Sequence, residues 1–198
     1  MRQAVLTQAG QGLGGGPLIV GLDPTGRTAD DEPTARRLRL APRPSSLAGA
    51  SVGLVINGLG RGDDLLDEVL RLIGCTQQLA GEVRVHKPSK ALPPTPEDWA
   101  RLTSRATGGI TAFGGCGSCS ARSLRDSLEL EWAGIPSVAL IHEGLAGSAR
   151  ANARLSGMPD YQFITIPFPY ATTGTWTDDE VLTLAAEITP AIVKHLTA

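Results

Sequence analysis

Short apolar runs alternate with longer amphipathic patterns from residue 51 to the end of the chain. The run 52–56 is typical of a buried strand, and aliphatic side chains recur at helical spacing in 63–73. The alternation continues with expected strands at 82–86, 110–113, 137–141 and 162–166, and expected helices at about 96–108, 120–132, 145–156 and 178–196. Strands joined by helices form parallel sheets that are covered on both faces, so we predict a three-layer α/β/α sandwich.

Residues 1–50 differ from this pattern because they are rich in glycine and proline. We expect an irregular N-terminal arm with one short strand at 18–22, wrapped around the α/β domain of residues 51–198. The segment Gly10 to Gly15 matches a dinucleotide-binding fingerprint by its letters, but no strand precedes it and Pro17 follows it. We therefore predict no nucleotide site there.

Composition narrows the classes of partner. The 198 residues carry a formal charge of -2 and only 4% aromatic residues, which favours neither nucleic acid nor an anionic membrane surface as a partner. No apolar run approaches the roughly 20 residues of a membrane-spanning helix. We expect a cytoplasmic protein, in which a close cysteine pair serves redox chemistry or metal binding more often than structure.

The motif Cys116-Gly117-Ser118-Cys119 follows an expected strand and opens an expected helix. Unpaired amides and the helix dipole at such a position stabilise a thiolate, which makes Cys116 the candidate nucleophile. Gly117 and Ser118 keep the loop tight, and Cys119 is placed to close a disulfide or to resolve a mixed one. We predict Cα atoms about 4.4 to 6.8 Å apart. The alternative is a pair of buried cysteines that act as small apolar residues.

Ligands of parallel sheets bind beyond the carboxyl ends of the strands. The polar or small residues expected there, outside the cysteine motif, are Asn57, Gly58, Lys87, Ser89, His142 and Glu143. His142 is a candidate general base or carbonyl-polarising group, and Lys87 with Ser89 could present a cation and a hydroxyl to an acidic substrate. Asn57, Gly58, Ser89, Glu143, Gly117 and Ser118 are candidate substrate-binding residues. The alternatives are a tight turn after Asn57, a histidine satisfied within the fold, and an ordinary proline-rich loop.

The sequence predicts neither a metal nor a cofactor. A structural zinc site needs four ligands, and no second close Cys or His pair accompanies the motif. His86 and His142 could complete a site only by converging in space. Cys75, at the end of an expected helix, is expected to be structural.

Several separated motifs give the chain a resemblance to a known family. They are Leu22-Asp23-Pro24-Thr25-Gly26, Asn57-Gly58, Lys87-Pro88-Ser89, the cysteine motif, Asp126, Glu129, Leu130, Glu131 and Gly134-Ile135-Pro136. In these the chain resembles the UGSC family, named for a selenocysteine-Gly-Ser-Cys motif whose first position is cysteine in many members. The resemblance covers most of the chain and implies a selenol- or thiol-dependent, redox-active protein. It also implies that Cys116 is the nucleophile, because a selenol is ionised at neutral pH.

The chain departs from the family pattern at three positions. Gly115 stands where an acidic residue often precedes the motif, Arg125 where a histidine often precedes the aspartate, and Phe168 where a His-Pro pair is common. The departures remove proton-transfer partners. They fit either a specialised member with a different substrate or one half of a pair whose other subunit completes the site.

Three functions follow, in descending order of support. The first is a thiol-dependent oxidoreductase in which Cys116 attacks a small-molecule substrate, Cys119 resolves, and an external thiol or thioredoxin-like reductant restores the dithiol. The second is a non-redox lyase, hydrolase or transferase with Cys116 as covalent nucleophile and Lys87 or His142 orienting the substrate. The third is a non-catalytic subunit. We expect a homo- or hetero-oligomer.

Overall fold

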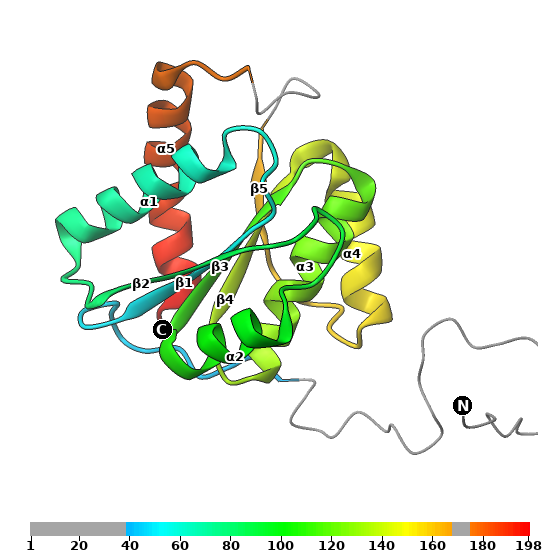
Figure 1. The fold of residues 1–198 in the computed structure, drawn as a ribbon, viewed down its shortest axis with the longest axis horizontal. Coiled ribbons are helices and arrows are strands. Elements are labelled where there is room, and N and C mark those ends of the chain that lie inside the picture. The colour runs from blue at the N-terminus through cyan, green and yellow to red at the C-terminus, as the bar shows by residue number, and fades with distance from the viewer. Residues whose placement is uncertain (1–38, 168–174) are drawn as a thin grey trace, which may run out of the picture. The chain divides into compact units, whose positions relative to one another are not determined.

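In the described part of the chain, five parallel strands form one sheet in the order β2-β1-β3-β4-β5 (Figure 1). The computed structural model describes residues 39–167 and 175–198. The strands are β1 Ser51–Ile56, β2 Gly81–His86, β3 Gly108–Gly114, β4 Ser137–His142 and β5 Ile164–Ile166. The helices are α1 Gly62–Thr76, α2 Pro96–Arg105, α3 Gly117–Trp132, α4 Ala146–Leu155 and α5 Asp178–Leu196, with the 3-10 turn η1 Glu143–Leu145 before α4.

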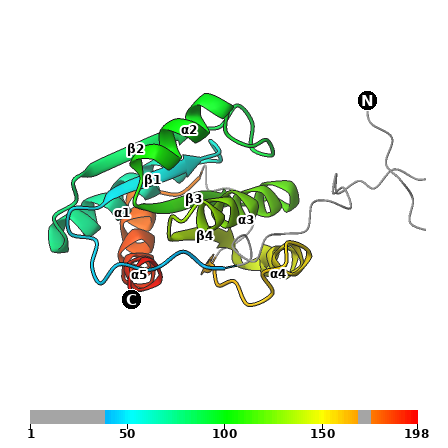
Figure 2. The same cartoon turned by 90° about the horizontal axis from the view of Figure 1, so that it is seen from below.

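Helices cover both faces of this sheet, which confirms the predicted α/β/α layering (Figure 2). Leu65, Leu66 and Val69 of α1 share one apolar core with Leu184 and Ile188 of α5 and with the sheet. On the other face, α3 and α4 form one cluster, and α2 and α3 form another. No helix within 39–167 or 175–198 is long and apolar enough to span a membrane.

Glycines at the start of β3 correct one expected boundary. We expected a helix to run to Gly108-Gly109, but α2 ends at Arg105 and β3 begins at Gly108. A Cβ at residue 109 would lie 2.7 Å from Leu130 Cδ1, so glycine here permits close packing of α3 on the sheet. The strand expected at 162–166 is shorter and begins at Ile164.

Residues 39–50 contain no helix or strand. Arg43 forms a two-pronged salt bridge with the buried carboxylate of Glu131, at 2.7 Å for each pair of atoms. The backbone N–H groups of Ala41 and Ser137 also donate to this carboxylate, at 2.6 and 2.8 Å. Glu131 thereby ties this segment to α3 and β4. The strand expected at 18–22 and the segment Gly10 to Gly15 lie outside the described residues.

The strand order fixes where a ligand site is expected. β1 and β3 are neighbours in the middle of the sheet. The chain continues from β1 outward to β2 at one edge, and from β3 to β4 in the opposite direction. The carboxyl ends of β1 and β3 therefore flank the switch point, where ligands bind in doubly wound sheets. Asn57 directly follows β1, and Gly115 and Cys116 directly follow β3.

Candidate functional site

The cysteine motif lies at the junction of β3 and α3, and its two cysteines are joined by a disulfide. Their Cα atoms are 5.0 Å apart, which confirms the predicted range. Cys116 is the N-cap of α3, and its Sγ accepts a hydrogen bond from the backbone N–H of Cys119 at 3.2 Å. Sulfur thus takes the place that a serine or aspartate oxygen usually holds at an N-cap.

The two sulfurs differ in access to solvent. Cys116 is half-buried, whereas Cys119 is 1% exposed beneath the first turn of α3. Gly117 and Ser118 are exposed, and the Ser118 hydroxyl lies 3.6 Å from Cys116 Sγ. An external group can therefore reach the sulfur of Cys116 more readily than that of Cys119.

Gly114 and Gly115, directly before the cysteine motif, lie in close contact with side chains and backbone of neighbouring elements. A Cβ at residue 114 would lie 2.7 Å from Ile141 Cδ1 and 3.0 Å from Ser120 Cα, and one at residue 115 would overlap the Leu59 Cδ2 methyl group. Leu59 from the loop after β1 therefore packs against Gly115, the residue directly before Cys116.

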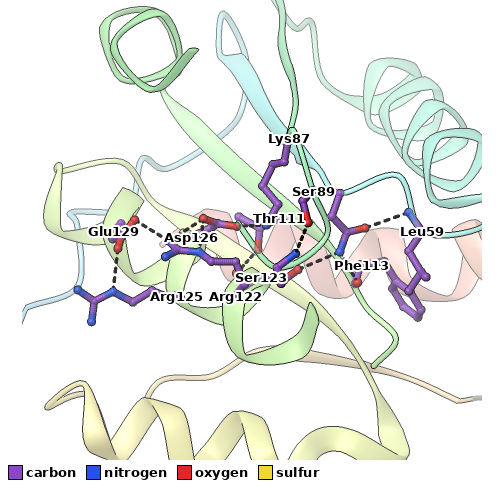
Figure 3. A network of polar contacts seen from close by, with 12 residues as sticks. Leu59, Lys87, Ser89, Thr111, Phe113, Arg122, Ser123, Arg125, Asp126 and Glu129 are labelled. Carbon is purple, nitrogen blue, oxygen red and sulfur yellow. Dashed lines mark hydrogen bonds and ion pairs between the residues drawn. The ribbon is translucent and has the colours of Figure 1, made fainter. Parts of the chain in front are cut away.

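Asn57 holds the ends of β1 and β3 together. Its side-chain amide donates to the Phe113 carbonyl at 2.7 Å, and its side-chain oxygen accepts from the Leu59 N–H at 3.1 Å (Figure 3). The side chain is buried by these contacts. Asn57 therefore positions the loops on both sides of the motif. The adjacent Gly58 has φ +68°, the backbone of a tight turn that favours glycine.

Lys87 does not extend toward the cysteines. Its ammonium lies 2.7 Å from Asp126 Oδ2 on α3, and the two side chains are 1% and 0% exposed (Figure 3). Asp126 lies ten residues after Cys116, about 15 Å along the helix axis. Ser89 in the same loop is exposed, and its hydroxyl accepts from the Ala91 N–H.

The Lys87–Asp126 pair belongs to a chain of charges along α3. Arg122 donates to Asp126 and Glu129, and Arg125 donates to Glu129 at 2.8 Å (Figure 3). Burial lowers the pKa of Lys87 and raises that of Asp126, and in each case the oppositely charged neighbours act against burial. Arg122 and Asp126 were not identified as site residues from the sequence. The spacing Arg122/Asp126 and Arg125/Glu129, four residues each, was the available signal.

His142 ends β4, on the strand next to β3, where Gly114 is paired with Ile141. The imidazole is buried, and its Nδ1 accepts the Gly144 N–H at 3.0 Å. Burial lowers its pKa, against the opposing effect of Glu143. A neutral ring with Nδ1 as acceptor carries its proton on Nε2, which makes it a donor there. Glu143 itself is exposed.

Cys75, a metal site and Phe168 were also considered from the sequence. Cys75 is exposed near the end of α1, and it is not joined to another cysteine. Among residues 39–167 and 175–198, no group of three His, Cys, Asp or Glu side chains could hold a metal ion. Phe168 lies outside the described residues.

Comparison with known protein families shows a match over most of the chain. A family model, described as the UGSC family, matches residues 21–198, which include every residue of the sheet and of the cysteine motif. No curated protein and no solved structure matches the chain.

Proposed function

The chain belongs to the UGSC family, and we propose that it is a thiol-dependent oxidoreductase with Cys116 as the attacking and Cys119 as the resolving cysteine. The observation that carries the proposal is the disulfide at the N-cap of α3, with one sulfur accessible and the other buried. Accessibility and helix amides both favour attack by Cys116.

The proposed reaction transfers two electrons from the dithiol to a disulfide substrate. The Cys116 thiolate attacks one substrate sulfur, so that a Cys116–substrate bond forms, the substrate disulfide breaks and one substrate thiol leaves. Cys119 then attacks the sulfur of Cys116, which closes the Cys116–Cys119 disulfide and releases the second substrate thiol. The protons of the two cysteine thiols end on the two released thiols. An external dithiol of the thioredoxin-like class reduces the protein disulfide for the next cycle.

The surroundings of the motif support a small substrate with an apolar part. Leu59 and Phe113 lie beside Gly115, and Ser118 places a hydroxyl near Cys116 Sγ. The competing non-redox reaction would use Lys87 or His142 to orient a substrate, and of these the Lys87 ammonium is already bonded to Asp126. The redox proposal needs only the two cysteines and the helix amides.

Trapping of the mixed disulfide tests the proposal. Reduced Cys119→Ser, on a Cys75→Ser background, should capture one equivalent of a small aromatic disulfide on Cys116 and release one thiol. The matched Cys116→Ser variant should capture far less, because Cys119 is buried. In the protein with both motif cysteines, intact mass should show loss of two hydrogens with no retained adduct. Retained adduct in that protein, with no closure of the disulfide, would overturn the resolving role of Cys119.

A further inference from the structure

Helix α5 has an apolar stripe on its outer face as well as on its inner one. Val181, Leu184, Ala185, Ile188 and Ile192 are buried against the sheet. A second set recurs at helical spacing: Leu182, Ala186 and Pro190 are exposed, and Val193, which is half-buried and packs partly against the core, continues the row toward the C-terminus. A surface helix that packs on one partner only is polar on its outer face, so this second stripe needs an explanation.

The outer stripe borders a groove between α5 and α1, which lie side by side on one face of the sheet (Figures 1 and 2). Leu72 and Thr76 of α1 form one wall, and the other is formed by Ala186, Pro190, Val193 and Lys194 of α5 and by Thr197 just after it. The groove has a volume of about 630 Å³. Leu182, at the opposite end of α5 from Thr197, is 47% exposed and is one of few large apolar side chains so exposed among the described residues.

Two opposite charges flank the stripe. Glu187 and Lys194 are both exposed, and they lie two helical turns apart on the same side of α5. Within the described part of the chain, neither side chain forms an ion pair. The two residues are equally far along the helix from the midpoint between Pro190 and Ala191.

We propose that this face is the interface of a homodimer, in which α5 packs antiparallel on α5 of a second copy about a two-fold axis between Pro190 and Ala191. The symmetry brings Glu187 of each copy level with Lys194 of the other, so two ion pairs form from one pair of residues. It also brings Pro190 of each copy level with Ala191 of the other, next to the groove that Pro190 lines. A self-complementary charge pattern fits a second copy better than an unrelated partner. The proposal is independent of the thiol chemistry.

Charge reversal tests this arrangement on the full chain. Analytical ultracentrifugation with reductant present, so that Cys75 cannot cross-link copies, should give twice the 20.6 kDa mass of the chain. Lys194→Glu and Glu187→Lys should each weaken the dimer by about tenfold or more, because each places two like-charged pairs across the axis. The double variant Glu187→Lys/Lys194→Glu should restore it. Lys90→Glu, an exposed charge on the loop after β2, is the matched control and should leave the dissociation constant unchanged.

Each outcome decides the proposal. A wild-type chain that is monomeric throughout a wide concentration series would overturn it. A dimer whose dissociation constant is insensitive to both single reversals, or is not restored by the double variant, would place the interface elsewhere and overturn it as well. Circular dichroism of each variant separates loss of dimer from loss of fold.

Discussion

The backbone N–H of Cys119 donates to the sulfur of Cys116 at 3.2 Å, across the first turn of α3. The residue that closes the disulfide thus also supplies a hydrogen bond to the accessible sulfur. In the reduced protein the same N–H can stabilise a thiolate on Cys116, in addition to the helix dipole. The proposed nucleophilic role of Cys116 therefore depends on the position of the Cys119 backbone.

Close packing at Gly115 gives a first prediction. Gly115→Ala should lower the free energy of unfolding by about 1–3 kcal/mol and slow capture of a disulfide on Cys116, because the added methyl overlaps Leu59 Cδ2. Denaturant unfolding and the rate of thiol release measure the two effects. Gly147→Ala on α4 is the control, since nothing lies within 4 Å of its Cβ. Adding Leu59→Ala to Gly115→Ala should recover part of the lost rate, and no recovery would show that Leu59 is not the obstruction.

The buried charge pair gives a second prediction. Lys87→Met should destabilise the protein by about 3 kcal/mol, because it leaves the Asp126 carboxylate buried with Arg122 as its remaining cation. The double variant Lys87→Met/Asp126→Asn should lose less than the sum of the two single variants. Urea unfolding of all four proteins provides the cycle, with the exposed Lys90→Met as control. Additive losses would mean that the two side chains are not coupled.

His195 gives a prediction about pH. Burial and the nearby Arg43 lower its pKa below the usual 6.5, although Glu131 acts in the opposite direction. The folded state therefore keeps this ring neutral where the unfolded chain takes up a proton, so stability falls as the pH decreases below about 6.5. His195→Phe, which keeps a ring against Tyr161, should reduce the loss of unfolding free energy between pH 7 and pH 5 by up to about 1.4 kcal/mol per pH unit. Equal losses in both proteins would contradict the assignment.

Periodicity along the sequence predicted most of the fold. The apolar run before Asn57 and the helical pattern of residues 178–196 gave the correct element types, and α5 spans the expected residues. The helix end predicted at Gly108-Gly109 was wrong, because a glycine pair can either end a helix or permit close packing in a strand. Only the position of Leu130 in the folded chain decides between the two. Local signals cannot separate such cases.

Prediction of the site was accurate for residues that contact each other within a few positions of the sequence. Cys116 and Cys119 are only one helical turn apart, so their spacing and their position at the start of a helix predicted that they lie within disulfide reach. The partner of Lys87 could not be predicted in this way, because Asp126 lies 39 residues away and the two meet only after α3 packs beside the loop that follows β2. The same limit applies to the positioning role of Asn57.

Titration of the individual thiols tests the central claim most directly. With Cys75 replaced by serine, the alkylation rate of reduced Cys119→Ser and reduced Cys116→Ser is followed against pH. The account predicts that Cys116 titrates well below the value of about 8.5 for a free cysteine and reacts rapidly at neutral pH, and that Cys116→Ser lacks this fast thiol. A fast-reacting thiol that survives in Cys116→Ser, or a Cys116 that reacts no faster than a free model thiol, would contradict the account.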